Sequence, residues 1–441
     1  MEPVDGAAGA MTPEALPEQT PRYPAWARWL LAVAAVLALA ALQAFRQRGV
    51  HAWDTIWAED GPIFYQGTRS LGSLFHTYSG YLELVPRTLG WIVNRVPVDQ
   101  VSRAITVTAA LTTALCGLAV YAFSGTLVRS PWLRVVLGVS VAVLPAALYE
   151  NLNSITNVIW PLLFANFWAL LAVPTNRRRS VLGATVCVLS ALSSVLALLY
   201  LPVTALLAWK RRDRESRIVF VAFFVAAAVQ GLFVLTANDQ SPKGTTHPAD
   251  LLPIYSVRVL GSGFLGEDWL GRAWNHLGFG VGAIAGAAAV VGVGLLLWRT
   301  RGTRRCLGAL AIGQSVFTYA IAIALRGSDG FKLIPDDFVP TGARFATLAL
   351  WLLLSGVAIL LTGARLPAVV RQVCIVLFVA WFAVLAVHDF RGVNSRSDGP
   401  SWAAGVAAAH ASCRDAPAGR VVEVPISPPG WSIRLTCSHT A

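Results

Sequence analysis

The sequence predicts an all-α polytopic membrane protein with about 11 transmembrane helices. Its 441 residues are 56% hydrophobic and only 13% charged, with a mean hydropathy of +0.60. A soluble protein of this length could not cover so much apolar surface, whereas a membrane protein leaves it in contact with lipid. Long apolar runs recur along the chain, and clusters of arginine alternate with loops that hold most of the acids.

The order of the apolar runs gives the domain boundaries. Residues 1–26 form a polar tail, which we expect to be disordered and cytoplasmic. Trp29–Phe45 approaches the roughly 20 residues that span a bilayer, so we interpret it as a retained helix rather than a cleaved signal peptide. Further runs occupy residues 102–123, 134–149, 158–173, 216–236, 277–298, 306–325, 345–363 and 371–388. They define a transmembrane domain at 27–388 and leave 389–441 as a small C-terminal segment.

The run from Ser180 to Trp209 is longer than one span requires. Arginines 177–179 precede it, and a second basic cluster begins at Lys210. Because basic clusters stay on the cytoplasmic side, we expect two crossings between them, with a turn near Ser193 and Ser194. A single long tilted helix is the alternative, and it would exchange the sides of every later loop.

The distribution of charge predicts the orientation. With the N-terminus inside, the cytoplasmic segments hold 18 of the 35 basic residues and 6 of the 23 acidic residues. The whole net charge of +12 then lies inside, which explains the high pI without nucleic-acid binding. Only three lysines accompany the arginines, and this usage suggests a GC-rich bacterial genome. We therefore expect a multi-pass protein of the bacterial inner membrane with an extracytoplasmic C-terminus.

Two cysteines lie in the C-terminal segment. Cys413 and Cys437 flank Val421–Pro425, whose alternating side chains are typical of a short strand. An oxidising exterior would favour a disulfide between them. The other cysteines lie in or at the ends of apolar runs, where a thiol behaves as a small apolar side chain.

The first outer loop, residues 46–101, holds the strongest candidate for a catalytic site. Adjacent acids, Glu59 and Asp60, lie just beyond the first apolar run. Glycosyl transfer needs a base for the acceptor hydroxyl and a cation for the leaving phosphate, and Asp60 assisted by Glu59 is the candidate base. Apolar residues at helical spacing over 62–75 predict an amphipathic helix on the membrane surface. Alternatively, Asp60 only caps this helix and Glu59 complements its dipole.

Other outer segments supply candidate contacts to a substrate. The candidates are Trp57, Tyr81, Arg87, Asn153, Asn157, Lys332 and Arg344. Each has a simpler alternative: aromatic residues anchor membrane proteins at the interface, Asn153 can cap a helix, and Arg344 can reach lipid headgroups. The adjacent acids Asp336 and Asp337 could bind a divalent metal ion, but without further ligands they do not define a metal site. No other cofactor is indicated.

At these residues the chain resembles the GT-C superfamily of integral-membrane glycosyltransferases, which use polyprenyl-phosphate sugars. The resemblance covers the order of apolar runs from Trp29 to His388, with similarity of residues at 57–64 and, more weakly, at 80–87 and 342–345. It implies that a first-loop acid, Asp60 or Glu59, acts as the base. The chain lacks the large soluble domain of the oligosaccharyltransferases, which argues against protein N-glycosylation.

The leading hypothesis is an inverting glycosyltransferase. Its partners would be a polyprenyl-phosphate sugar donor, a glycan or glycolipid acceptor and membrane lipids. A transporter or flippase for lipid-linked glycans is one alternative, but the apolar runs carry no ionisable residue near their centres. A non-catalytic assembly protein that binds partners through its C-terminal segment is another.

Overall fold

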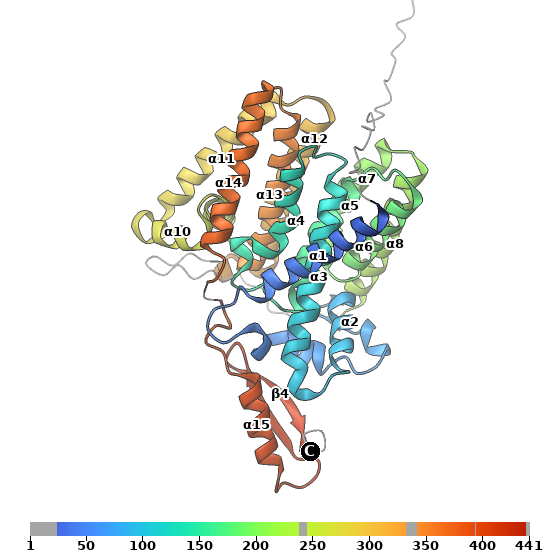
Figure 1. Ribbon diagram of the computed structural model, residues 1–441, viewed down its shortest axis with the longest axis vertical. Coiled ribbons are helices and arrows are strands. Elements are labelled where there is room, and N and C mark those ends of the chain that lie inside the picture. The colour runs from blue at the N-terminus through green and yellow to red at the C-terminus, as the bar shows by residue number, and fades with distance from the viewer. Residues whose placement is uncertain (1–23, 238–244, 332–341, 393, 438–441) are drawn as a thin grey trace, which may run out of the picture.

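The computed structural model describes residues 24–237, 245–331, 342–392 and 394–437. In this part of the chain nearly all regular structure is helical, and two short antiparallel hairpins are added to it. The long helices form a bundle, and the first loop and the C-terminal segment lie together beyond one end of it (Figure 1). The all-α prediction is confirmed.

Seven helices in the described residues are long and apolar enough to cross a membrane. They are α1 (Ala25–Ala44), α3 (Val101–Ser124), α8 (Arg214–Thr236), α11 (Phe279–Arg299), α12 (Gly302–Arg326), α13 (Ala343–Gly363) and α14 (Ala368–His388). The other helices are α2 (Leu84–Val93), α4 (Pro131–Val143), α5 (Ile159–Leu171), α6 (Arg177–Ala191), α7 (Leu201–Lys210), α9 (Leu251–Tyr255), α10 (Ser262–Leu277) and α15 (Trp402–Cys413). Several apolar helices indicate a multi-pass membrane protein, whereas the count of about 11 crossings stays a prediction.

Helix α13 is the most deeply buried of these long helices. Trp351 of α13 stacks on Phe164 of α5, with ring centroids 5.3 Å apart. One turn further along, Ser355 Oγ accepts a hydrogen bond of 3.1 Å from Trp168 Nε1 of α5. These contacts fix α13 against α5, and both helices begin at the end of the bundle where the first loop lies.

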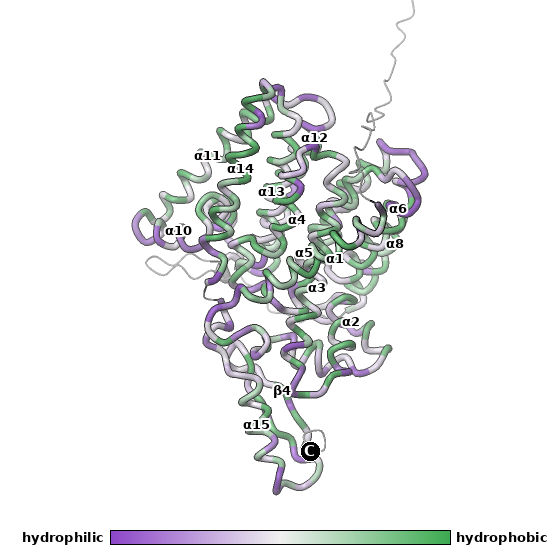
Figure 2. Tube along the Cα trace, in the orientation of Figure 1, coloured by the Kyte–Doolittle hydropathy of each residue, from purple (hydrophilic) through white to green (hydrophobic). Residues whose placement is uncertain are grey.

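The outer helices leave apolar side chains uncovered. Val290 of α11 is 74% exposed and Val387 of α14 is 78% exposed. Hydrophobic residues follow these helices, while hydrophilic residues gather at the helix ends and in the loops beyond them (Figure 2). Apolar faces of this extent are stable against lipid and not against water, so the sides of the bundle form a lipid-facing surface.

The segment at residues 177–210 is a helical hairpin. Helices α6 and α7 are separated by a break at 192–194 and a 3₁₀ turn. At one end of the segment Ser180 hydrogen-bonds Glu215, which follows α7. At the break, Ser193 Oγ accepts the amide hydrogen of Val85, over 2.9 Å, at the start of α2. Because the two ends lie together and the middle lies near α2, the chain reverses at the serines, as predicted.

The predicted continuous helix over residues 62–75 is wrong. The structure has a π-helical turn at Gly61–Tyr65 and a 3₁₀ turn at Gly72–Phe75, with irregular chain between them. Ser73 Oγ donates to the Ser70 carbonyl over 2.6 Å, and Ser70 Oγ accepts the Ser73 amide over 3.3 Å. Such local bonds from serine compete with helical hydrogen bonds. The amphipathic helix of this loop is α2, which follows.

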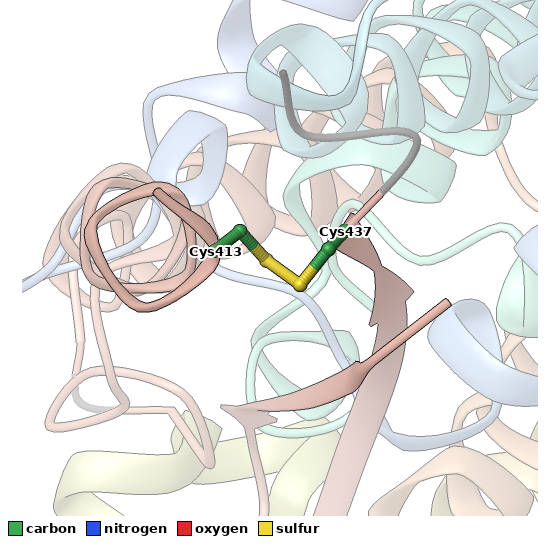
Figure 3. Close-up of a disulfide and its surroundings, with 2 residues drawn as sticks. All are labelled: Cys413 and Cys437. Carbon is green, nitrogen blue, oxygen red and sulfur yellow. A yellow bond between two sulfur atoms is a disulfide. The ribbon is translucent and has the colours of Figure 1, made fainter. Parts of the chain in front are cut away.

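Four short strands form two antiparallel hairpins. They are β1 (Thr77–Tyr78) with β2 (Tyr81–Leu82), and β3 (Val421–Ile426) with β4 (Trp431–Thr436). The strand predicted at Val421–Pro425 is thus confirmed. Cys413 at the end of α15 and Cys437 after β4 form a disulfide, with Cα atoms 5.2 Å apart (Figure 3). Helix α15, the second hairpin and this disulfide make up the C-terminal unit, residues 394–437.

The C-terminal unit packs against the acidic turn of the first loop. Trp57 forms a parallel β-bridge with Ser427, and the Ala58 amide donates to the Ser427 carbonyl over 2.5 Å. A Cβ atom on Gly61 would lie 2.8 Å from the side chain of Ile433, so only glycine permits this close approach. The last strands of the chain therefore help to set the position of the turn that carries Glu59 and Asp60.

Candidate functional site

The two acids of the first loop face different surroundings. They lie in a 3₁₀ turn over Ala58–Asp60, in which Ala58 has a φ of 25°. Asp60 is fully buried. Its Oδ1 accepts hydrogen bonds from Ser154 Oγ at 3.0 Å, from the Thr156 amide at 2.9 Å and from Thr156 Oγ1 at 2.6 Å. Glu59 instead lines a cavity, so the two neighbours in sequence do not share one site.

Asp60 joins the first loop to the turn between α4 and α5. Burial raises the pKa of Asp60 to about 6, while the hydrogen bonds from Thr156 and the charge of Arg396 lower it. Asp60 therefore remains mostly ionised at neutral pH. The alternative that it caps the following helical turn is wrong, because its side chain makes no capping hydrogen bond there. Asp60 acts as a positioning residue for the turn that holds Glu59.

A cavity of about 140 Å³ lies where the first loop meets the starts of α5 and α13 and the end of α12. Aromatic side chains that line it include Trp160 and Phe345. The charged and polar residues that line it include Glu59, Glu83, Tyr78, Tyr81, Asn157, Arg326 and Arg344. Glu59 Oε2 and Glu83 Oε2 are buried and have no hydrogen-bond partner among the described residues. Buried oxygens without partners are rare, and a bound ligand would supply what they lack.

Glu83 is almost completely buried beside this cavity, at 2% exposure. Burial raises the pKa of Glu83 to about 8, although a hydrogen bond from Tyr81 and the charge of Arg87 lower it. The side chain therefore carries a proton at neutral pH. A neutral carboxylic acid in an apolar site can donate a hydrogen bond to a substrate oxygen, which a carboxylate cannot do.

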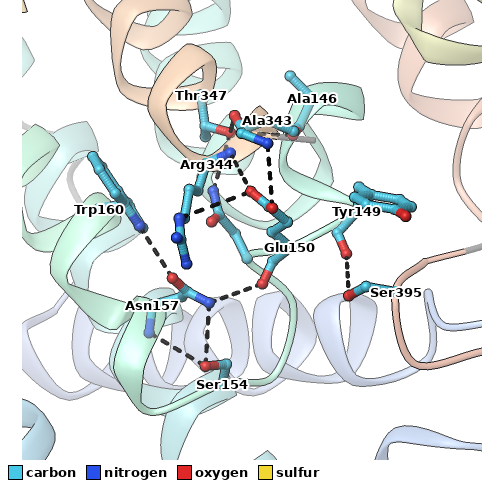
Figure 4. Close-up of polar contacts among 12 residues, drawn as sticks. Ala146, Tyr149, Glu150, Ser154, Asn157, Trp160, Ala343, Arg344, Thr347 and Ser395 are labelled. Carbon is cyan, nitrogen blue, oxygen red and sulfur yellow. Dashed lines mark hydrogen bonds and ion pairs between the residues drawn. The ribbon is translucent and has the colours of Figure 1, made fainter. Parts of the chain in front are cut away.

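Arg344 is oriented by the N-terminal end of α13. Glu150 Oε2 accepts the Arg344 amide over 3.1 Å and lies 3.9 Å from the guanidinium Nε (Figure 4). The other oxygen of Glu150 accepts the Gly342 amide over 3.3 Å, so this carboxylate caps α13. The guanidinium carbon lies 5.3 Å from the ring centroid of Phe345. Glu150 thus directs Arg344 toward the cavity through one long ion pair, which leaves guanidinium N–H groups for a ligand.

A second arginine, Arg326, is the last residue of α12 and lines the same cavity. Burial and the charges of Glu59 and Glu83 raise the pKa of Tyr78 to about 12, whereas Arg326 and Arg344 lower it. All four ionisable groups therefore influence the pKa of one side chain. The cavity combines two carboxyl groups with two guanidinium groups in a small volume.

Of the two predicted asparagines, the structure brings one to the cavity. Asn157 Nδ2 donates to the Glu150 carbonyl over 2.8 Å, and its Oδ1 accepts Trp160 Nε1 over 3.2 Å (Figure 4). Asn153 is buried with a φ of 52° and donates to the carbonyl of Gln43, outside the cavity lining. Asn157 shapes the cavity wall, and Asn153 holds the turn beneath it.

Arg87 and Trp57 also lie outside the cavity lining. The Arg87 guanidinium donates to the carbonyls of Ile63 and His76 at 3.0 and 3.1 Å, which ties the irregular part of the first loop to α2. Trp57 forms the bridge to the C-terminal unit. Lys332 lies outside the described residues, as do Asp336 and Asp337.

No protein-family model matches the chain, and no curated protein sequence matches it significantly. The residues that line the cavity are therefore what indicates its role. Three of them, Tyr78, Glu83 and Arg326, were missed by the sequence interpretation. The sequence contains a signal for Arg326: like Arg344, it lies where an apolar run meets the outer loop between them. Glu83 comes directly before the apolar stretch that forms α2.

A separate group could offer ligands to a metal ion. Asp268, His388 and Asp389 each place a donor atom within 4.8 Å of the others. His388 Nδ1 lies 2.8 Å from Asp389 Oδ1, and the other oxygen of Asp389 accepts the Glu267 amide over 2.6 Å. Because these groups already satisfy one another, we assign no metal to them.

Replacing Arg396 by methionine is expected to destabilise the protein by about 1–3 kcal/mol, the usual cost of leaving buried acceptors without a hydrogen-bond donor. Arg396 is 3% exposed and donates to the carbonyls of Leu152 and Asn153. Burial lowers the pKa of Arg396 to about 10, and Asp60 raises it. Thermal unfolding in detergent measures the effect, with exposed Arg391→Met as the matched control. Equal melting temperatures for both variants would contradict this role.

Proposed function

We propose that the protein is an inverting membrane glycosyltransferase. It would move a sugar from a polyprenyl-phosphate donor to a hydroxyl group of a cell-envelope glycan or glycolipid. The observation that carries this proposal is the cavity, which is lined by Glu59 and Glu83, each with an unpaired oxygen, and by Arg326 and Arg344. These are the groups that deprotonation of an acceptor and departure of a phosphate require.

In this proposal Glu59 is the base. It takes the proton from the acceptor hydroxyl, whose oxygen attacks the anomeric carbon of the donor sugar. The bond from that carbon to the phosphate oxygen breaks, and the phosphate leaves with the electron pair. Arg326 and Arg344 stabilise the negative charge on the departing polyprenyl phosphate. This assignment moves the role of base from Asp60 to Glu59, because Glu59 lines the cavity, whereas Asp60 is fully buried outside its lining and binds Ser154 and Thr156 through Oδ1.

A lipid-linked donor agrees with the surroundings of the cavity. Arg326 ends one apolar helix and Arg344 begins another, so both guanidinium groups stand at the edge of the apolar layer that these helices form. A polyprenyl chain would extend among the helices while its phosphate remains at this edge. A nucleotide-sugar donor would instead require a phosphate-binding glycine loop at a helix N-terminus.

The proposal includes the orientation in the membrane. The Cys413–Cys437 disulfide lies at the same end of the bundle as the cavity, and a disulfide persists in an oxidising compartment. The arginine-rich loops between α11 and α12 and between α13 and α14 lie at the other end. We therefore propose that the cavity faces the outside of a bacterial inner membrane that the chain crosses about 11 times.

Sugar transfer in isolated membranes tests the proposal. Membranes with and without the protein receive a panel of radiolabelled polyprenyl-phosphate sugars, and the products are separated into lipid, glycan and protein fractions. Protein-dependent loss of label from one donor, with inversion of its anomeric configuration in the product, would support it. Donor movement across the bilayer without transfer would support the alternative of a flippase.

Glu83→Gln is expected to retain transfer at neutral pH and to remove a fall in activity as the pH rises through about 8. Ionisation of wild-type Glu83 places a second negative charge near the phosphate, whereas glutamine still donates a hydrogen bond and does not titrate. The pKa of Glu83 is raised in the folded state, so its contribution to stability is present below pH 4.5 and is lost as the pH rises through about 8.

Two measurements check this prediction. Initial rates across the pH range compare the alkaline limbs of wild type and Glu83→Gln. Melting temperatures over the same range should show the variant gaining stability relative to wild type toward alkaline pH. Identical alkaline limbs in both proteins would exclude Glu83 as the group that titrates there.

A further inference from the structure

An apolar groove of about 490 Å³ runs along α11, α13 and α14, and it shares no lining residue with the polar cavity. Side chains from all three helices line it, among them Leu296, Leu354, Cys374 and Phe378. Arg299 is the one charged residue among those that line it. A groove with apolar walls and a single cation at one end fits an amphiphile with an anionic head.

The groove lies on the lipid-facing surface. Two of its walls belong to α11 and α14, which the rest of the protein covers less than any other described long helix except α1. Leu295 of α11 is 53% exposed and Val370 of α14 is 44% exposed, and both line the groove. A hydrocarbon chain from the surrounding membrane therefore reaches it without a route through the protein, whereas a water-soluble ligand would not.

The end of the groove at Arg299 is strongly basic. Residues 299–305 and 363–371, which we call the arginine loops, contain six arginines and no acidic residue. Their backbones are joined, because Thr300 and Ala364 form a β-bridge and the Arg365 amide donates to the Arg299 carbonyl over 2.8 Å. No acidic side chain among the described residues forms an ion pair with these arginines. The fold thus holds like charges together, and a bound anion would relieve their repulsion.

The arginine loops and the polar cavity are separated by the length of α13. Arg344 stands at the start of this helix, and Arg365 follows its end. Twenty-one residues of α-helix extend about 30 Å, which is the thickness of the hydrocarbon core of a bilayer. The basic end of the groove therefore lies at the leaflet opposite the one that borders the cavity, so a ligand whose head is bound at this end is not the donor or acceptor proposed above.

We propose that the groove binds one anionic phospholipid from the leaflet that contacts the arginine loops. An acyl chain lies along Leu296, Leu354 and Phe378, and the phosphate contacts Arg299 with Arg365 beside it. Basic pockets between membrane helices bind anionic headgroups in this way. The lipid would fix the ends of α11, α13 and α14 relative to one another.

Cys374 provides a probe inside the groove. It is half-buried among the lining residues, whereas Cys306 at the start of α12 is exposed near the same end of the bundle. Cys116 and Cys187 are buried, and Cys413 and Cys437 are joined in the disulfide. A thiol reagent applied to the full-length, non-reduced protein thus compares one cysteine in the groove with one outside it.

The test measures maleimide modification of detergent-solubilised protein by peptide mass spectrometry. Phosphatidylglycerol is expected to slow modification of Cys374 severalfold, phosphatidylcholine with the same acyl chains is expected to have little effect, and Cys306 should react alike in both. Arg299→Gln should weaken the protection by phosphatidylglycerol about fivefold, the contribution of one arginine at an anionic lipid surface. The matched control is Arg217→Gln, an exposed arginine of α8 away from the groove.

Three results would overturn the proposal. Equal protection by the two lipids would mean that the groove accepts acyl chains without recognising the headgroup. Absence of protection by either lipid would mean that the groove is empty in solution. Equal loss of protection in Arg217→Gln and Arg299→Gln would mean that net charge, rather than this site, attracts the lipid. Arg365→Gln serves as a second variant if Arg299→Gln lowers the melting temperature.

Discussion

Glu59→Gln is expected to lower the rate of sugar transfer by about 10²–10⁴-fold, the range that a general base contributes. Glutamine keeps the size and hydrogen-bonding shape of the side chain but cannot accept a proton at the acceptor hydroxyl. Binding of the donor should be nearly unchanged, because the variant retains Arg326 and Arg344. The loss should therefore appear in kcat rather than in KM.

Two other carboxylates serve as controls for this result. Asp60→Asn is expected to lower the melting temperature and to reduce transfer indirectly, since its Oδ1 holds Ser154 and Thr156. Asp99→Asn alters an exposed acid of the same loop outside the cavity lining and should have wild-type activity. If Glu59→Gln transfers sugar at the wild-type rate while Asp60→Asn is inactive but stable, the base is Asp60, and the proposed assignment is wrong.

Arg344→Gln is expected to lower kcat/KM by about 10²–10³-fold, the cost of losing one donor that stabilises developing charge. The phosphate would lose a guanidinium group that Glu150 holds in a fixed orientation. Arg344→Lys should recover part of the activity, because lysine supplies the charge without the planar fork of donors. The measurement is initial rate against donor concentration, with donor affinity determined separately.

The structural alternative for Arg344 makes a different prediction. An arginine that only reaches lipid headgroups would affect stability in the membrane and leave kcat/KM unchanged. The matched control is Arg103→Gln, which removes an exposed arginine of α3 outside the cavity lining. Wild-type kinetics in Arg344→Gln, together with a changed melting temperature, would assign Arg344 to the interface and leave Arg326 as the remaining cation for the phosphate.

The parts of the fold that depend on hydropathy alone could be predicted from the sequence. The predicted runs at 277–298 and 371–388 correspond to α11 and α14 within a few residues, because an apolar run of this length is stable in lipid only as a helix. The break at Ser193 and Ser194 was also predictable, since basic clusters on both sides constrain the path of the chain. The short turns of the first loop were not, because Arg87 and the serines there bind backbone groups that a helix would use.

Only some residues of the candidate site could be predicted from the sequence. Hydropathy and composition led to the first loop and to Arg344, which line the cavity, but they could not distinguish Glu59 from Asp60. That difference depends on the 3₁₀ turn at Ala58 and on contacts with Thr156, nearly one hundred positions away in the chain. Glu83 was missed for the same reason, since its raised pKa is a consequence of burial by segments distant in sequence.

The bridge between Trp57 and Ser427 bears on the order in which the protein is made. The ribosome completes the first loop long before the C-terminal unit, so Glu59 lacks its neighbouring strand during most of synthesis. Only when β3, β4 and the Cys413–Cys437 disulfide have formed does the acidic turn gain its final support. A nascent or C-terminally shortened chain would thus enter the membrane before its cavity is fully formed. The acidic turn would take its final position only after the C-terminal unit has folded.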